Sequence, residues 1–214
     1  MPDRQLSPKE KIMHQLAPQV SYASIQHKPI RKEVLEEQDL QAVADLVWHG
    51  IRDGFYRDII GVRSRAEVLE FLRGVATRCE FRRYDRASRR TRTVVAALWV
   101  YAVQGVAVGF AILSETIAEP AKRGIELLMF GVMTRHRGLG YGASILDNVI
   151  KKVSEQYFNL VVRCPEDNQV LLLMLVTRGF ISLDRHCHGR VLRLTPLLNV
   201  RRSSGILSPS TYPE

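Results

Sequence analysis

The chain has 214 residues, of which 46 % are hydrophobic and 25 % are charged, and its formal net charge is +9 at pH 7. This length and composition fit one globular domain with extensions, or at most two small domains, with enough apolar residues for a sizeable core. No run of eighteen uncharged apolar residues and no secretory signal is visible, so we expect a cytoplasmic protein without a membrane-spanning helix.

The histidine and cysteine pattern argues against disulfides and against a metal site. The three cysteines, Cys79, Cys164 and Cys187, form an odd number without CxxC spacing, which indicates reduced thiols. His186, Cys187 and His188 are adjacent in an expected turn, where three neighbours cannot easily close a tetrahedral site. We therefore expect no bound metal.

The N-terminal half predicts a short strand and two helices. Residues 1–27 are polar and proline-containing and are expected to form a flexible arm. Residues 28–200 are the expected folded domain, and residues 201–214 the tail. Ile30–Leu35 is a candidate strand, and Asp39 is expected to cap a helix whose apolar residues follow a helical period up to Ile51. Ser64 and Glu67 have the spacing of a capping box that opens the second helix.

An arginine cluster follows the second helix. Six arginines and one aspartate lie between Arg82 and Arg92. Such a cluster attracts nucleic acid, an acidic partner or a polyanionic cofactor, or else it is a solvated loop that maintains solubility. The solvated loop is favoured, because no aromatic stacking pattern and no DNA-reading motif accompanies the charge.

The rest of the chain predicts strands and helices around a glycine-rich loop. Thr93–Val103 and Val106–Leu113 read as an antiparallel hairpin, and Ile125–Met133 as a strand covered on both faces. The loop precedes a helix, and then come a strand, a second helix and a closing hairpin, in this order: Asn159–Arg163, Asn168–Thr177, Phe180–Leu183 with Arg190–Thr195. The expected fold is α/β, with a mixed, mostly antiparallel central sheet flanked by helices.

The loop Arg135–Gly142 has the chemistry of a pyrophosphate site. Its glycines allow sharp bends and close approach to a ligand, and the first amides of the following helix point at any anion bound there. Arg135 and Arg137 add charge in the forked form that suits phosphate oxygens. A nucleotide P-loop needs Lys and Ser or Thr where Ala143 and Ser144 stand, and a Rossmann loop needs an acidic residue near Asn159, so both fit poorly.

The segment Arg137–Gly142 resembles the Arg/Gln-x-x-Gly-x-Gly/Ala signature of GNAT acyltransferases. Asn168, Leu171 and the pair Gly179-Phe180 resemble the second conserved block of that family. The resemblance spans about Ile30 to Thr195 and implies the GNAT fold and a bound acyl-CoA, with acetyl-CoA as donor. It implies that the pantetheine arm follows the strand end and that the pyrophosphate lies on the loop amides. The implied cofactor-binding residues are Val132, Met133, Arg135, Arg137, Gly138, Leu139, Gly140, Tyr141, Gly142 and Asn168.

Glu126 is the candidate general base. It is a single charge in an apolar strand, where burial without a partner or a task is costly, and its position resembles that of the base in several family members. Many relatives also have a tyrosine seven residues after the asparagine, which protonates the leaving thiolate, but this chain has Leu175 there. Cys164 and Thr177 are possible substitutes, although a structural role is favoured for both.

The sequence thus predicts an acetyl-CoA-dependent N-acetyltransferase that transfers the acetyl group directly to a primary amine of a small molecule or protein. Two alternatives stay open. Leu175 is compatible with a non-catalytic acyl-CoA-binding module, and the arginine cluster with a nucleic-acid-associated basic protein. The acceptor is not identified, although six acidic residues between Glu36 and Asp58 could form a local negative site, and Ser114 and Glu115 lie near the expected amine entrance.

Overall fold

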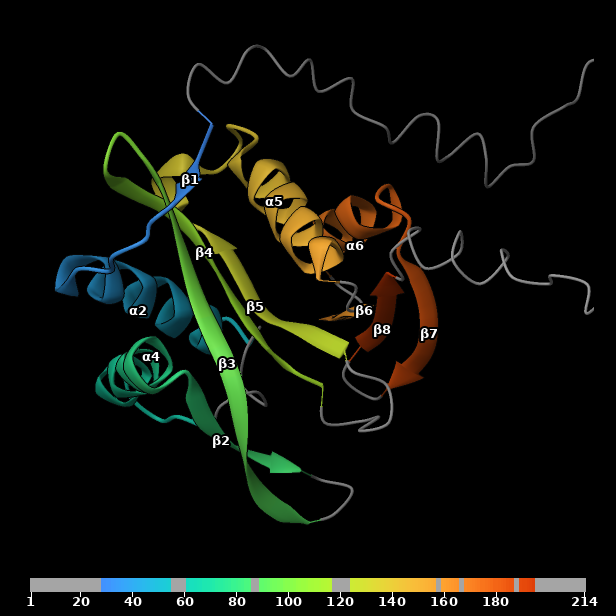
Figure 1. Ribbon diagram of the computed structural model, residues 1–214, viewed down its shortest axis with the longest axis horizontal. Helices are drawn as coiled ribbons and strands as arrows, with labels where there is room; N and C mark the ends of the chain where they lie inside the picture. Colours follow the sequence, from blue (N-terminus) through green and yellow to red (C-terminus); the bar gives the residue numbers. More distant parts are fainter. Residues whose placement is uncertain are drawn as a thin grey trace, which may run out of the picture.

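The computed structural model describes residues 28–54, 61–85, 89–116, 124–156, 159–165, 168–186 and 189–194. These residues form one curved, mostly antiparallel sheet with the strand order β1-β3-β4-β5-β6-β8-β7, and β2 pairs with β3 (Figure 1). The strands are β1 (Ile30–Arg31), β2 (Glu80–Asp85), β3 (Arg90–Val103), β4 (Val106–Glu115), β5 (Gly124–Val132), β6 (Asn159–Cys164), β7 (Ile181–His186) and β8 (Gly189–Leu194). The predicted fold class is confirmed.

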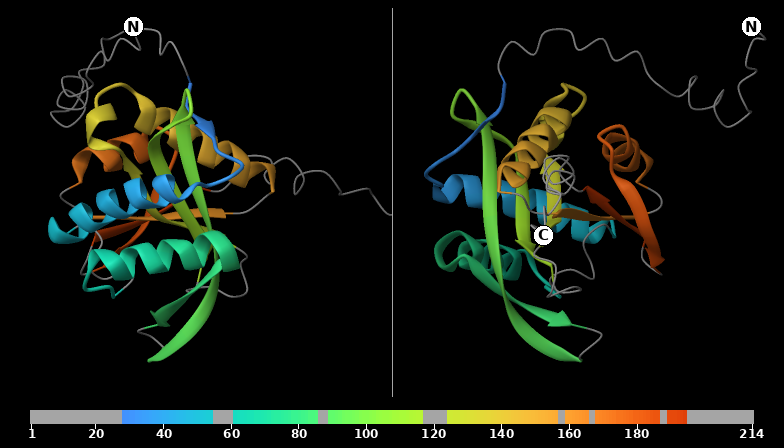
Figure 2. Two further views of the ribbon diagram at one scale, coloured as in Figure 1. Left: turned by 90° about the vertical axis from the view of Figure 1, so that its left-hand side faces the viewer. Right: turned by 45° about the vertical axis from the view of Figure 1, so that its right-hand side comes forward.

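Helices cover both faces of the sheet. The helices α2 (Glu37–Arg52) and α4 (Arg65–Arg78) lie side by side on one face, and α5 (Tyr141–Glu155) and α6 (Gln169–Val176) lie on the other (Figure 2). Each layer has its own core, one under α2 and α4 with Phe110 and Met129, the other under α5 and α6 with Tyr101 and Leu146. Among the described residues, no helix is long and apolar enough to cross a membrane.

The first helix begins earlier than its sequence suggested. Glu36 is the N-cap residue, and Asp39 lies inside the first turn, where its carboxylate accepts a hydrogen bond from the N–H group of Glu36 at 2.9 Å. Asp39 is also buried and pairs with Lys32 Nζ at 2.6 Å. The prediction of Asp39 as the cap is therefore wrong, because this carboxylate reaches back to the cap residue's amide and also holds the chain that enters from β1.

The second helix begins as predicted. The Ser64 hydroxyl oxygen accepts a hydrogen bond from the Glu67 N–H group at 3.2 Å, which is one half of a capping box. The Glu67 carboxylate accepts from the Arg63 N–H group at 2.8 Å instead of from Ser64. Both contacts satisfy amide groups that have no acceptor within the helix.

Four arginines of the cluster lie on a strand pair, whereas the sequence favoured a loop: Arg82, Arg83, Arg90 and Arg92. Arg89 lies in the turn just before β3, and Arg86 is outside the described residues. Arg82 and Arg83 belong to β2, which pairs with β3 from Glu80↔Val95 to Asp85↔Arg90. This hairpin extends beyond the rest of the sheet at the bottom of Figure 1. The strand was missed because its charged residues hide the alternation of faces: Phe81 is buried and Arg83 is half-buried, whereas Arg82 and Tyr84 are exposed.

The central hairpin has the predicted geometry. Gln104 and Gly105 join β3 to β4, and both have positive φ (50° and 80°), as a two-residue turn between twisted antiparallel strands requires. The predicted arm at 1–27 and tail at 201–214 lie outside the described residues. The candidate strand Ile30–Leu35 is much shorter than expected, because only Ile30 and Arg31 pair with β3.

Candidate active site

The sheet splits between β5 and β6. These strands pair in parallel only from Gly124↔Asn159 to Leu127↔Val162. At the same level Leu128 is an extra residue of β5, because the pairs Leu113↔Leu127 and Ile112↔Met129 leave it without a partner on β4. Such a bulge bends a strand, and here β5 runs on past β6 toward the loop that opens α5 (Figure 1). Within the part of the chain that the structure describes, the β5 edge beyond Leu127 has no neighbouring strand on the side of β6.

The glycine loop begins where β5 ends. Gly138 and Gly140 have φ of 78° and 79°, the left-handed region that a side chain disfavours, and Gly140 is the N-cap residue of α5. The first hydrogen bond into the helix runs from Ser144 N–H to Gly140 O at 3.2 Å. The amides of Tyr141, Gly142 and Ala143 precede it and have no acceptor within the helix. Aligned amides at a helix N-terminus form an anion site, so the loop fits a pyrophosphate.

The loop's charged side chains lie at its exposed surface. Arg137 Nε donates to the carbonyl of Val132 at 3.3 Å, and Arg135 Nε lies 3.1 Å from His136 Nε2. The His136 ring packs edge-on against Tyr141 with 6.0 Å between centroids. Burial and the Arg135 charge lower the pKa of His136, so this ring adds little positive charge near neutral pH. The two arginines therefore supply the formal charge beside the amides.

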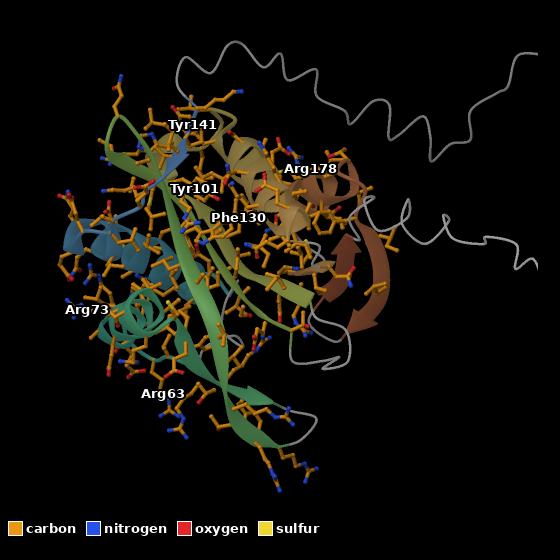
Figure 3. The ribbon with its side chains drawn as sticks, viewed as in Figure 1. Arg63, Arg73, Tyr101, Phe130, Tyr141 and Arg178 are labelled. Atoms are coloured by element: carbon orange, nitrogen blue, oxygen red, sulfur yellow. The ribbon has the colours of Figure 1, made fainter. Side chains whose placement is uncertain are left out.

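Gly142 and its neighbours pack α5 closely on the end of β5. A Cβ atom at Gly142 would lie 3.4 Å from Val132, 3.6 Å from Met174 and 3.7 Å from Phe130. Figure 3 shows Tyr141 at the loop, Phe130 below it on β5, and Arg178 beside α5 and α6. Arg178 connects the two helices: its Nε donates to Asp147 Oδ1 at 2.6 Å and its Nη1 to the Met174 carbonyl at 2.9 Å. The first turn of α5 is thus held from both sides.

In two of the predicted cofactor residues, Val132 and Met133, a backbone group that could bind the pantetheine arm already makes a hydrogen bond within the protein. The N–H group of Met133 donates to Val108 O at 2.9 Å, and the carbonyl of Val132 accepts from Arg137. The edge available to an extended ligand therefore lies earlier on β5, from the Leu128 bulge onward. Asn168 is the N-cap residue of α6, and its side-chain oxygen accepts from the Leu171 N–H group at 3.1 Å.

Glu126 lies on β5 just before the split and is 1 % exposed. Arg83 of β2 holds it with two hydrogen bonds, Nη1 to Oε2 at 2.7 Å and Nη2 to Oε1 at 3.3 Å. Arg163 of β6 donates from Nε to Oε1 at 2.8 Å. Burial raises the pKa of Glu126, but hydrogen bonds and charge from the two arginines outweigh it, so the net pKa is lowered. Glu126 is therefore an ionised carboxylate between two guanidinium groups.

Arg83 and Arg163 are the site residues that sequence reasoning missed. Arg163 gave a signal of the same kind as Glu126, a single charge in an apolar strand, because it follows Leu160, Val161 and Val162. Arg83 gave no separate signal, since it was one of six arginines in its cluster. Only the pairing of β2 with β3 brings Arg83 over the carboxylate.

Ser114 lies directly opposite Glu126 in the β4–β5 ladder, so the two side chains share one face of the sheet. It is 2 % exposed, and among the described residues its hydroxyl has no hydrogen-bond partner. A buried hydroxyl without a partner is uncommon and points to a place where a ligand atom or a water belongs. The sequence had placed Ser114 near the amine entrance.

The residues considered for protonating the leaving CoA thiolate make contacts within the protein core or the helix end. Leu175, at the position of the expected tyrosine, is fully buried in the core under α5. The Cys164 thiol is also buried, 3.5 Å from the Pro165 carbonyl. The Thr177 hydroxyl donates to the carbonyl of Leu173 at 2.9 Å, at the end of α6. No protein acid for the thiolate is therefore assigned.

The acidic residues of α2 form ion pairs and not an acidic pocket. Glu37 pairs with Arg73 and Asp45 with Arg65, both between α2 and α4, and Asp39 pairs with Lys32. Within the described ranges, no group of three or more metal-ligating side chains comes together.

Comparison with known proteins decides the family. The sequence model of the acetyltransferase (GNAT) family matches residues 65–180, more than half of the chain and the part that holds β5, the split and the glycine loop. The chain belongs to the GNAT acetyltransferase family. No curated protein matches this sequence.

Solved structures agree with GNAT membership at the level of the fold. The PaiA N-acetyltransferase of Thermoplasma acidophilum in complex with coenzyme A superposes with a TM-score of 0.52 at 12 % identity, covering 78 % of this chain and 99 % of that one. The spermidine N-acetyltransferase of Vibrio cholerae gives 0.53 at 14 % identity, covering 84 % and 99 %. NAA60 of Arabidopsis thaliana with a bisubstrate analogue gives 0.52 at 12 %, covering 78 % and 98 %. GNAT membership supports an acyltransferase activity.

Proposed function

We propose that this protein is an acetyl-CoA-dependent N-acetyltransferase that transfers the acetyl group directly to a primary amine. The observation that carries the proposal is the split between β5 and β6 with the glycine loop at its end. The split offers an unpaired strand edge for an extended arm, and the first amides of α5 offer an anion site for its pyrophosphate. A similar fold holds coenzyme A in the Thermoplasma acidophilum enzyme.

The proposed cofactor site consists of the loop residues, Asn168, and the β5 edge from Leu128 to the strand end at Val132 and Met133, of which the part nearer Leu128 has the free backbone edge for the arm. Arg135 and Arg137 would neutralise the phosphates, and the amides of Gly138–Gly142 would bind their oxygens. Gly138 and Gly140 give the loop its left-handed bends. The acyl donor supplies the thioester, from which the acetyl carbon passes to the amine nitrogen as the C–S bond breaks and the C–N bond forms.

Glu126 is proposed as the group that binds the incoming amine and accepts its proton. An ammonium has no lone pair and must lose a proton before it attacks. Glu126 is the buried carboxylate nearest the level of the split, since its ladder partner Val161 comes directly before the last β5–β6 pair. Its two arginine partners keep it ionised and therefore able to receive a proton.

The cofactor assignment is tested by thermal unfolding with acetyl-CoA. A ligand at a hundredfold excess over its dissociation constant stabilises the folded state by about 2.7 kcal/mol, which corresponds to a rise of several degrees in melting temperature. We expect this rise in the wild type and its loss in Gly140→Glu, because the variant places a negative charge and a Cβ atom in the anion site. Gly54→Glu is the control, since Gly54 has positive φ like Gly140, and nothing lies within 4 Å of the position that its Cβ atom would take.

The same experiment also shows which outcomes would contradict the cofactor assignment. If no acyl-CoA raises the melting temperature of the wild type, the loop is only a turn that packs α5 on the sheet. If Gly54→Glu loses the rise as well, the effect is a general one on folding. A rise without acetyl transfer to any amine would instead favour the non-catalytic acyl-CoA-binding module, the alternative that the buried Leu175 keeps open.

A further inference from the structure

Two guanidinium groups converge on one buried carboxylate beside the proposed reaction centre. Arg83 and Arg163 come from strands on opposite sides of β5, and both bind Glu126. The cluster therefore has two positive charges and one negative charge. A positive charge that no carboxylate of the cluster neutralises attracts an anionic group of a ligand. The acceptor side of this site is thus positive.

The excess charge lies on Arg163. Arg83 is 13 % exposed in its side chain and uses both terminal nitrogens on Glu126, whereas Arg163 is 44 % exposed and uses only Nε. Within the described residues, Nη1 and Nη2 of Arg163 donate to no protein acceptor. These two nitrogens form one edge of the planar fork, and that edge matches a carboxylate bidentately.

Arg163 also stands at the right place for a substrate. It directly follows Val162, the last β6 residue that pairs with β5, and so lies at the mouth of the split. Ser114 presents its unpartnered buried hydroxyl on the same face, opposite Glu126. A polar ligand that contacts Arg163, Glu126 and Ser114 would satisfy the guanidinium edge and this hydroxyl together.

We propose that the acceptor is an amine that carries a carboxylate, with the carboxylate bound by Arg163 and the amine held at Glu126. This inference rests on the proposed N-acetyltransferase function and names its substrate class. The acceptor anion balances the second guanidinium charge, and the acceptor ammonium replaces part of Arg163's contact with Glu126. The ammonium first loses one proton to Glu126, and the free amine attacks the thioester carbonyl. As the C–N bond forms and the C–S bond breaks, the nitrogen loses a second proton, which balances the leaving thiolate as the CoA thiol.

The proposal disfavours polycationic acceptors. A polyamine or a lysine-rich peptide would bring several positive charges to a site that already has an excess of one. The acidic residues of α2 do not offset this repulsion, because Glu37 and Asp45 are paired with arginines of α4. An acceptor with an ammonium and a carboxylate complements Glu126 and Arg163 together, whereas a polycation complements only Glu126.

The test compares matched acceptors with the full-length protein and acetyl-CoA, following the release of the CoA thiol. Glycine, β-alanine, γ-aminobutyrate and glutamate are each paired with the carboxamide that lacks the tested charge. We expect kcat/KM for at least one acid to exceed that of its carboxamide by about tenfold or more, as loss of a charge-assisted hydrogen bond implies. Equal rates for every acid and its carboxamide would overturn the proposal.

Variants assign the preference to Arg163. Arg163→Gln should raise the KM of the acid more than that of its carboxamide, so the ratio of the two kcat/KM values should fall toward one, whatever the change that both share through Glu126. Arg163→Lys should recover part of the effect, because it keeps the charge and loses the fork. Arg82→Gln is the matched control, since it removes one arginine from the exposed face of β2. The same loss in Arg82→Gln and Arg163→Gln would show only a general charge effect and reject the assignment.

A binding measurement separates this proposal from the proposed function. The melting temperature is measured with CoA alone and with CoA plus each acid or carboxamide. If CoA itself gives no shift, the cofactor assignment fails. If CoA binds but the acids stabilise the protein no more than their carboxamides, and none is acetylated faster, the acceptor proposal alone is rejected. Stabilisation by acids but not carboxamides supports it even if turnover is absent.

Discussion

At the scale of single residues, the ionisation of Glu126 bears on its proposed role as base. A carboxylate with a lowered pKa is a weaker base than a free one, so the proposed effect of Glu126 on the amine depends on position and charge more than on basicity. An acceptor anion on Arg163 would cancel one of the two charges that lower the pKa of Glu126. Binding of such an acceptor would therefore strengthen the base at the moment when it is needed.

Replacing Glu126 by glutamine tests its role. The amide keeps the size of the side chain but cannot accept the amine's proton, so we expect kcat to fall by about 100-fold or more. Acetyl-CoA affinity should change little, because the proposed phosphate and arm contacts lie elsewhere. Steady-state kinetics and calorimetric titration of acetyl-CoA measure the two effects. Glu70→Gln on the exposed face of α4, away from the proposed site, is the control.

Two results would remove Glu126 from the proposed mechanism. The first is a kcat in Glu126→Gln equal to that of the wild type. The second is a parallel loss of acetyl-CoA binding and melting temperature, which would show that the ion pairs with Arg83 and Arg163 only hold the strands together.

At the scale of elements, the contact between β4, β5 and α5 sets the position of the loop. Gly109 of β4 lies opposite Val132, the last residue of β5. A Cβ atom at Gly109 would lie 2.7 Å from the backbone oxygen of Gly131 and 2.7 Å from Ile145 of α5. The absent side chain therefore lets α5 sit close to the sheet, where its first turn meets the proposed ligand.

Gly109→Ala should lower the stability of the protein by about 1–3 kcal/mol, because part of the clash is with backbone that cannot rotate away. Gly131→Ala is the matched comparison. Its Cβ atom would meet side-chain ends, Phe110 Cε1 at 2.8 Å and Leu46 Cδ2 at 3.1 Å, which can shift. Chemical denaturation of both variants should give a larger loss of stability for Gly109→Ala. The reverse order would contradict the role of Gly109 in the packing of α5.

Local sequence signals predicted most of these elements. The Gln104-Gly105 turn, the Ser64 cap and the glycine loop before α5 each depend on residues within a few positions of one another, and all three are in the structure. The two failures were also local. Asp39 was predicted as the cap, but it is the third residue of a capping box whose N-cap is Glu36, which is not a usual N-cap residue. The strand β2 was missed because its charged residues obscure the alternation of buried and exposed positions.

At the scale of the whole molecule, the basic side chains that give the net charge of +9 are unevenly distributed. Arg83 is half-buried against Glu126, whereas Arg89, Arg90 and Arg92 are exposed near the far end of the β2–β3 hairpin, which projects from the sheet (Figure 1). An exposed basic hairpin without a base-reading motif binds nucleic acid only through phosphates. This surface is separate in sequence and in fold from the glycine loop.

We expect binding of duplex DNA to be weak, independent of sequence and steeply dependent on salt. Replacing Arg89, Arg90 and Arg92 together by glutamine should reduce the slope of log K against log salt by about 3, because each arginine neutralises about one phosphate. Acetyl-CoA should not compete. Fluorescence anisotropy over a salt series measures both. Tight, salt-insensitive or sequence-specific binding would instead favour the nucleic-acid-associated alternative.

The sequence by itself determined the α/β class and the place of the glycine loop before α5, because glycine conformation, helix capping and apolar periodicity are properties of short segments. Its motifs also carried the resemblance to the GNAT family, which the family model confirms. The sequence also singled out Glu126, because a single carboxylate in an apolar strand is costly to bury without a partner. Only the tertiary structure decided what surrounds that charge. Arg83 and Arg163 lie 43 and 37 residues from Glu126 along the chain, and only the pairing of β2 with β3 and of β6 with β5 brings their guanidinium groups to one carboxylate.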